Sequence, residues 1–129
     1  MIMSGVRAAG VLLVAGLLVA GCSNADEPAV RDAASAFAGG DEQVRCGLLA
    51  PATLASLEQE EGSSCAEAIG ELPVGGGTVV SVEVWGADAL VHLSDDSLFL
   101  TRDDDGWLVS AAACTPGGDG PYECQLEGA

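Results

Sequence analysis

Residues 78–109 read TVVSVEVWGADALVHLSDDSLFLTRDDDGWLV, and this stretch decides the fold class. Apolar and polar residues alternate at a period of two, the pattern of a half-buried β-strand. In the first segment Val80, Val82 and Val84 are predicted to share one face, with Ser81 and Glu83 on the other. Turn-forming residues interrupt the pattern at 86, at 95–96 and at 103–106. Short strands separated by such turns are typical of an antiparallel meander.

The predicted strands cover about residues 78–84, 89–93, 98–100 and 107–109. An extension of the fourth strand to residue 113 and a short final strand at residues 125–126 are candidates. Upstream, four helices are predicted.
These helices span about residues 28–38, 41–49, 52–60 and 65–72. Helices followed by antiparallel strands define an α+β class, here N-terminal helices packed on a curved antiparallel sheet of about four strands.

The first helix has a clear beginning and a predicted buried face. Asp26 is placed to cap it, and Pro28 suits its first turn. Gly39-Gly40 ends it. The apolar stripe expected to face the sheet, at three- and four-residue spacing, consists of Ala29, Ala33, Ala36 and Phe37.

The start of the chain has the features of an export signal. Arg7 precedes an apolar run of 13 residues, Ala8 to Ala20. A membrane-spanning helix needs about 20 apolar residues, whereas a run of this length after a basic residue is typical of a secretion signal. The run ends in Val19-Ala20-Gly21-Cys22, which resembles the lipobox of bacterial lipoproteins. An ordinary cleaved signal, with Cys22 incidental, is the alternative.

The lipobox resemblance predicts the organisation of the whole chain. Residues 1–21 form a lipoprotein signal peptide, residues 22–27 a polar tether, and residues 28–129 a single α+β domain. Cys22 becomes the lipidated N-terminus. Diacylglycerol holds a protein to a membrane more firmly than one acyl chain does. The expected location is the extracytoplasmic face of the cell membrane.

The charge of the exported part restricts its partners. Removing residues 1–21 takes away one arginine and no acid, so the net charge falls from −16 to −17, with three arginines and no lysine left. Phosphate backbones are bound mainly through Lys and Arg, so nucleic acid is excluded as a partner. A solvated surface is the ordinary meaning of this acidity, and a cationic partner or divalent ions are the alternatives.

Four cysteines remain after Cys22, and an even number in a small exported domain indicates two disulfides. Three pairings are open on paper. Cys46–Cys65 with Cys114–Cys124 is the local choice, closing loops of 20 and 11 residues. A zinc site at these cysteines is disfavoured, because the chain has no CxxC pair and His92 is its only histidine.

Several segments together resemble small actinobacterial lipoproteins with a cystatin-like or NTF2-like α+β domain, over about residues 29–127. These are Cys46-Gly47-Leu48-Leu49-Ala50-Pro51, Cys65, Val84-Trp85-Gly86, Leu98-Phe99-Leu100-Thr101, Gly106-Trp107 with Val109, and Cys114 through Pro121-Tyr122-Glu123-Cys124. The NTF2-like resemblance implies a sheet curled around a helix into a cone with an apolar mouth. Such domains bind ligands, assemble with proteins or, in a few cases, catalyse reactions, so the fold alone does not assign a function.

Few residues qualify for a functional site. Trp85 and Trp107 flank turns at the same end of the meander and are the candidate ligand-binding residues, able to line a cone mouth. The alternative is that both fill the core.

Steroid-isomerase-like relatives pair a carboxylate with a tyrosine, but Tyr122 lies inside the stapled loop, where packing is expected. His92 is expected to face away from Val91 and Leu93, so no catalytic residue is assigned.

Acidic turns offer one metal hypothesis. Asp88 would lie near Asp103, Asp104 and Asp105, and carboxylates suit Ca²⁺. The spacing does not match an EF-hand, however, and consecutive Asp residues before Gly are ordinary turn formers. We therefore assign no metal and no cofactor.

The sequence thus predicts a membrane-tethered binding or interaction module. Its specificity is unassigned, and the candidate partners are a protein or a small apolar ligand. The alternative is an NTF2-like enzyme or enzyme subunit acting on a small apolar ligand.

Overall fold

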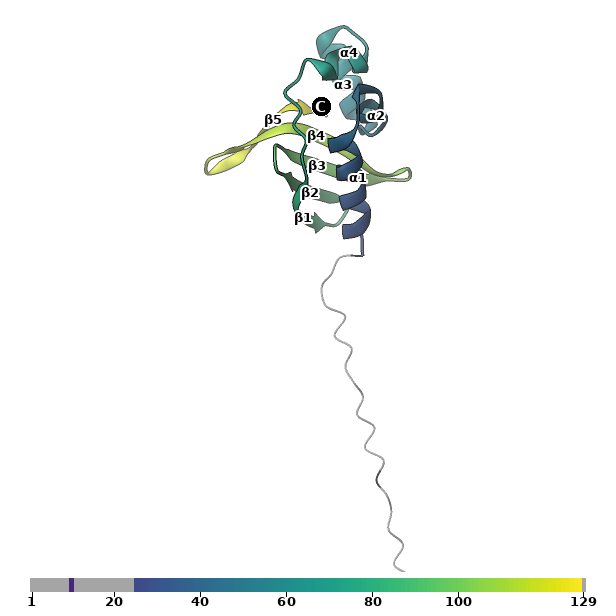
Figure 1. The fold of residues 1–129 in the computed structure, drawn as a ribbon, viewed down its shortest axis with the longest axis vertical. Helices are drawn as coiled ribbons and strands as arrows, with labels where there is room; N and C mark the ends of the chain where they lie inside the picture. The colour runs from purple at the N-terminus through teal and green to yellow at the C-terminus, as the bar shows by residue number, and fades with distance from the viewer. Residues whose placement is uncertain (1–9, 11–24, 129) are drawn as a thin grey trace, which may run out of the picture.

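A computed structural model describes residue 10 and residues 25–128, in which four helices precede five strands (Figure 1). The helices are α1 (Glu27–Gly39), α2 (Glu42–Gly47), α3 (Pro51–Glu61) and α4 (Cys65–Gly70). The strands are β1 (Val79–Trp85), β2 (Asp88–Leu93), β3 (Ser97–Asp103), β4 (Gly106–Gly117) and β5 (Gly120–Glu127). The predicted α+β class is confirmed. Apart from residue 10, the predicted signal peptide lies outside the described residues, and so does Cys22.

The sheet is an open antiparallel meander in the order β1-β2-β3-β4-β5. It has five strands, so the prediction of about four was wrong. The segment expected to be a stapled loop is instead the end of a long hairpin, in which Cys114 lies opposite Cys124. Only the residues around Gly118 form its turn, and the residues on either side pair as strands.

Helix α1 crosses one face of the sheet and closes the core (Figure 1). Phe37 is fully buried and packs in one cluster with Leu98, Leu100 and Val109, which are also almost completely buried. We call the sheet face against α1 the inner face and the opposite face the outer face. Burial of such large apolar side chains is the main favourable term in folding.

The buried stripe of α1 differs from the predicted one. The helix buries Val30, Ala34, Phe37 and Ala38, whereas Ala29 and Ala36 are exposed. Val30, Ala34 and Phe37 follow the i, i+4, i+7 spacing of one helix face. This face buries the larger Val30, so it removes more apolar surface from water than the predicted stripe would.

A bulge in β1 overturns one predicted strand face. Val79 pairs with Leu93 and Ser81 with His92, so Val80 is the extra residue between them. An extra residue shifts the alternation of side chains by one position. Val80 is therefore 67% exposed, and Val79 packs against the core in its place.

The helical half is held by the Cys46–Cys65 disulfide, which joins α2 to the first residue of α4. The predicted local pairing of all four cysteines is confirmed. Helix α3 lies between the two bonded residues in sequence and packs against α4. The backbone amide of Cys65 donates to the Glu58 carboxylate at 3.2 Å, so a side chain of α3 also caps α4.

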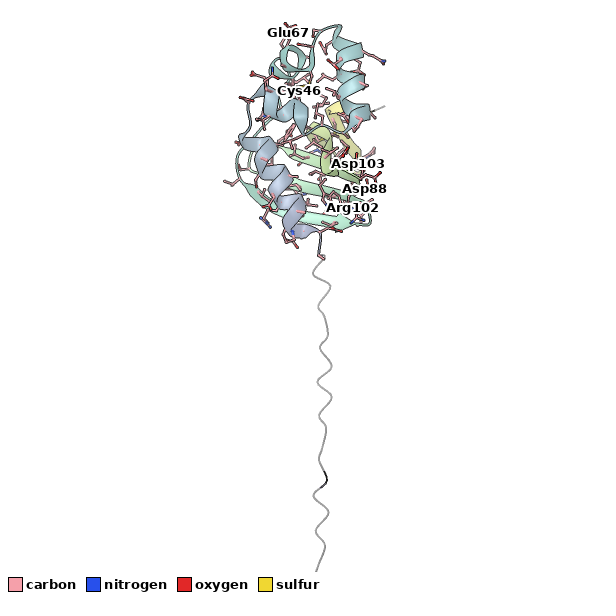
Figure 2. The ribbon with its side chains drawn as sticks, turned by 90° about the vertical axis from the view of Figure 1, so that its right-hand side faces the viewer. Cys46, Glu67, Asp88, Arg102 and Asp103 are labelled. Atoms are coloured by element: carbon pink, nitrogen blue, oxygen red, sulfur yellow. A yellow bond between two sulfur atoms is a disulfide. The ribbon has the colours of Figure 1, made fainter. Side chains whose placement is uncertain are left out.

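Asp26 precedes α1 but does not cap it through its side chain. Its carboxylate instead pairs with the Arg102 guanidinium of β3, at 3.1 Å. Figure 2 shows Arg102 at the edge of the domain that also holds Asp88 and Asp103. The prediction of Asp26 at the cap position is confirmed, but its side chain forms no capping hydrogen bond, and the carboxylate pairs with the distant Arg102.

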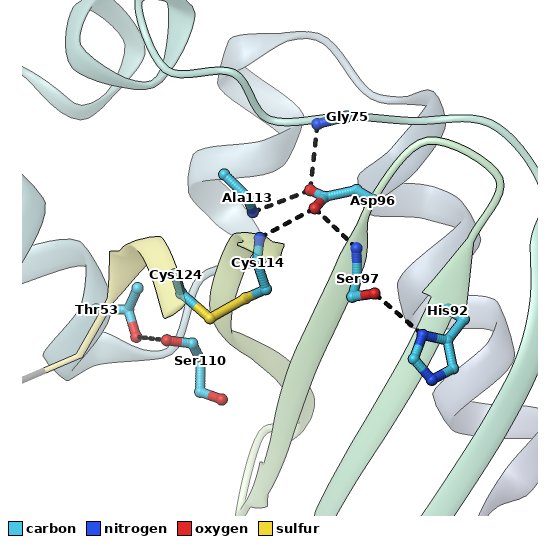
Figure 3. The surroundings of a disulfide bond; sticks show 9 residues. All are labelled: Thr53, Gly75, His92, Asp96, Ser97, Ser110, Ala113, Cys114 and Cys124. Atoms are coloured by element: carbon cyan, nitrogen blue, oxygen red, sulfur yellow. Dashed lines mark hydrogen bonds between the residues drawn. A yellow bond between two sulfur atoms is a disulfide. The ribbon is translucent and has the colours of Figure 1, made fainter. Parts of the chain in front are cut away.

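Asp96 joins three separate segments through its carboxylate (Figure 3). One oxygen accepts from the amides of Gly75 at 3.2 Å and Ala113 at 2.9 Å. The other accepts from Ser97 at 2.7 Å and Cys114 at 3.1 Å. The loop before β1, the start of β3 and the middle of β4 are therefore fixed together beside the Cys114–Cys124 disulfide.

Candidate functional site

The outer face of the sheet is defined by register. Val84, Ala89, Leu100 and Val109 are successive cross-strand partners, and all pack in or against the core. Their neighbours in sequence point the other way, because side chains alternate along a strand. Trp85, Asp88 and Thr101 consequently form one row on the outer face, since they too are successive partners.

A second bulge shapes this face. Phe99 pairs with Ala111 and Leu100 with Val109, so Ser110 is an extra residue in β4. Its carbonyl oxygen accepts from the Thr53 hydroxyl at 2.9 Å (Figure 3). The same oxygen accepts from the amide of Gly128 at 3.2 Å. The bulge therefore fastens both the start of α3 and the end of β5 to β4.

An open groove of about 430 Å³ lies where these elements meet. It runs over the outer face from β2 to the end of β5 and is bordered by the first turn of α3. Its lining residues are Ala50, Ala52, Thr53, Asp88, Phe99, Thr101, Ser110, Ala111, Glu127 and Gly128. We call this surface the outer groove. It combines an aromatic ring, hydroxyl groups and two carboxylates.

The two carboxylates of the outer groove belong to Asp88 and Glu127, both of which are exposed. Within residues 25–128, the side chain of neither forms a hydrogen bond or an ion pair. No arginine lines the groove. Its negative charge is therefore balanced by no cation of the described chain.

The two candidate tryptophans are placed on opposite faces of the sheet. Trp107 lies two residues before Val109 in β4, so both side chains point to the inner face. Trp107 belongs to the core cluster and is 8% exposed. Trp85 follows Val84 on the edge strand β1 and is 50% exposed on the outer face. They flank turns at the same end of the meander, as expected, but they do not line one surface. Only Trp85 is available to a ligand, beside Asp88 at the outer groove.

His92 and Tyr122 are brought together, though not in a catalytic arrangement. The Tyr122 ring meets Phe99 edge-on at 5.5 Å between centroids, and it lies 6.3 Å from the His92 ring. His92 shares a 3.0 Å hydrogen bond between its Nδ1 atom and the Ser97 hydroxyl. These contacts pack the β4–β5 hairpin against β2 and β3, in agreement with the packing role expected of Tyr122.

The acidic turns form ordinary backbone turns. The Asp103 carboxylate accepts from the amide of Asp105 at 2.8 Å, within the same turn. Among the described residues, no three His, Cys, Asp or Glu side chains gather in a way that could hold a metal ion. The calcium hypothesis thus gains no support from this part of the chain.

Comparison with family models, with curated proteins and with solved structures finds no match for this chain. None of the helices in the described part is long and apolar enough to cross a bilayer. The site must therefore be interpreted from its own geometry.

Sequence reasoning missed the outer groove. Its lining comes from α3 and from four different strands, and the bulge at Ser110 that joins them leaves no trace in the apolar pattern. One signal was present in the sequence. Trp85 directly follows Val84, so if Val84 faces the core, Trp85 faces outward. Asp88, its partner across the β1–β2 turn, then lies on the same outer face.

Proposed function

We propose that this chain is a lipid-anchored extracytoplasmic protein of the cystatin-like or NTF2-like kind. Its outer groove binds a partner without catalysing a reaction. The single observation that carries the binding role is the open groove of about 430 Å³ on the sheet face that α1 leaves uncovered. Concave sites of roughly 300–1,000 Å³ with a few converging polar groups are the usual form of ligand sites.

Two features of the domain support binding rather than catalysis. The inner face is filled by α1, so the cone interior that an NTF2-like enzyme would use is occupied by Phe37 and its neighbours. A general base is commonly a carboxylate taken out of water, whereas Asp88 and Glu127 are exposed. The enzyme alternative therefore has no specific observation in its favour.

The membrane anchor is proposed from residues 1–22 alone. Replacing Cys22 with Ala removes the sulfur that would carry the lipid. We expect the variant protein to appear in the soluble fraction or to remain unprocessed, as measured by fractionation and intact-mass spectrometry. A variant that stays in the membrane and differs in mass from the wild-type protein only by the Cys-to-Ala exchange refutes the anchor.

Photocrosslinking tests the binding role. A benzophenone amino acid placed at Thr101, inside the outer groove, should crosslink one defined partner in the native envelope. The same amino acid at Gln59, an exposed position of α3 outside the groove, is the matched control. Crosslinking of the same products from both positions, or of none from Thr101, would contradict a binding role for the groove.

A further inference from the structure

Trp85 and Asp88 form an exposed pair at one end of the outer groove. They are direct cross-strand partners on either side of the β1–β2 turn, and both are exposed. The Cβ atoms of such partners lie about 4.5–5.5 Å apart. An indole face attracts a cation, and a carboxylate accepts charged hydrogen bonds from an ammonium or guanidinium group. This pair therefore has the chemistry to receive one Lys or Arg side chain.

The described chain supplies no cation to this pair. The chain has no lysine, and its three arginines after residue 22 are all engaged elsewhere. Arg31 pairs with Glu27, Arg102 with Asp26, and Arg45 donates to the carbonyl oxygens of Phe37 and Ala38. Within residues 25–128, no lysine or arginine is left for this pair, so we expect its cation to come from another molecule.

A second unpaired carboxylate lies at the opposite end of the outer groove. Asp88 is on β2 and Glu127 on β5, three strand spacings away in the sheet. Glu127 lies in the row of Leu90, two residues along β2 from Asp88. At about 4.8 Å per strand spacing and about 3.3 Å per residue along the strand, the two positions lie roughly 16 Å apart. An extended chain advances about 3.3–3.6 Å per residue, so about four to five residues connect them. Phe99 and Ala111 line the floor between them, because Phe99, Ala111 and Glu127 are successive partners.

We infer that the outer groove binds an extended segment of a partner protein that carries two Lys or Arg residues about four positions apart. One cationic side chain lies between Trp85 and Asp88, and the other pairs with Glu127. This inference rests on the proposed binding function and adds the chemistry of the partner.

A protein segment fits better than two other occupants. A second copy of the chain carries the same strongly negative charge, −16 over its full length, and like charge opposes association. A single small amine satisfies only one of the two carboxylates. An extended cationic segment satisfies both and covers the apolar floor between them.

Peptide titration tests the inference. The probe is an acetylated, amidated heptapeptide of alanine and glycine with arginine at its second and sixth positions. The matched peptide has citrulline, a neutral isostere, at both positions. Binding to the ¹⁵N-labelled full chain in zwitterionic micelles is followed by NMR at low ionic strength. We expect the arginine peptide to shift the Trp85 indole and the amides of Thr101 and Glu127, and the citrulline peptide to leave them unchanged.

Variants locate the contact. Asp88→Asn, Glu127→Gln and Trp85→Ala should each raise the dissociation constant by about two- to fivefold, the size expected for one exposed charged or cation–π contact. Asp119→Asn removes the same charge at the exposed tip of the β4–β5 hairpin and should leave the constant unchanged.

Several results would overturn the inference. These are equal binding of the citrulline peptide, equal weakening by Asp119→Asn, no binding of the arginine peptide, and self-association of the chain through the same residues. Each leaves the proposed binding function standing if Thr101 still crosslinks a partner in the envelope. Loss of that crosslink is the separate failure of the proposed function.

Discussion

Replacing Asp96 with Asn should destabilise the domain far more than its position in a turn suggests. The carboxylate of Asp96 faces four backbone amides, two at each oxygen. An Asn side chain keeps one oxygen and places an NH₂ group where the other was. Whichever way the amide turns, two backbone N–H donors then face another donor.

The magnitude follows from the lost bonds. A hydrogen bond to a charged group contributes about 1.5–3 kcal/mol net, and the site is partly exposed, so the lower end of that range applies. Losing two bonds therefore costs about 3 kcal/mol, before any weakening of the remaining two by loss of the charge. A domain of this size has a free energy of unfolding of about 5–15 kcal/mol, so the change removes a large share of it.

Urea denaturation followed by circular dichroism measures the effect. About 3 kcal/mol corresponds to a midpoint lowered by about 1–3 M urea and a Tm lowered by more than about 10 °C. Asp95→Asn is the matched control, because Asp95 is the exposed neighbour in the same turn and its carboxylate makes no hydrogen bond within the described residues. If the two variants unfold within about 0.5 kcal/mol of each other, the role assigned to Asp96 is refuted.

Three further changes test other parts of the fold. Cys46→Ser should free the Cys65 thiol for alkylation and cost about 3 kcal/mol by removing the restriction on the unfolded chain; Cys65 found bonded to another cysteine contradicts the pairing. Phe37→Ala empties the fully buried centre of the core and should cost about 3–5 kcal/mol in urea unfolding; a cost below about 1 kcal/mol contradicts that placement. Arg102→Gln removes a partly exposed ion pair and should cost less than about 1 kcal/mol, so a loss comparable to that of Phe37→Ala contradicts the assignment.

The parts of the fold that the sequence predicts well are those set by local patterns. Apolar residues at every second position, Ala89, Val91 and Leu93, place β2 correctly, and these three side chains are buried. The disulfide pairing follows because short loops favour Cys46 with Cys65, and the structure has that bond. Both inferences depend only on residues close together in the chain.

The parts that could not be predicted depend on single extra residues and on distant partners. The bulge at Val80 reverses which valine of β1 faces the core, and no local pattern indicates where a strand takes up an extra residue. Asp26 has every property of a helix cap, yet its carboxylate binds Arg102, which lies 76 positions later. Only the assembled sheet brings those two side chains together.

The candidate site shows the same division between local pattern and assembled structure. The alternation in β1 and β4 suffices to separate Trp85 from Trp107, because one follows an inward valine and the other lies in phase with Val109. The outer groove does not follow from any such alternation. It exists because the bulge at Ser110 turns one carbonyl oxygen toward both the Thr53 hydroxyl and the amide of Gly128. The loss of strand pairing at that residue is what lets α3 and the end of β5 form the walls of the proposed binding surface.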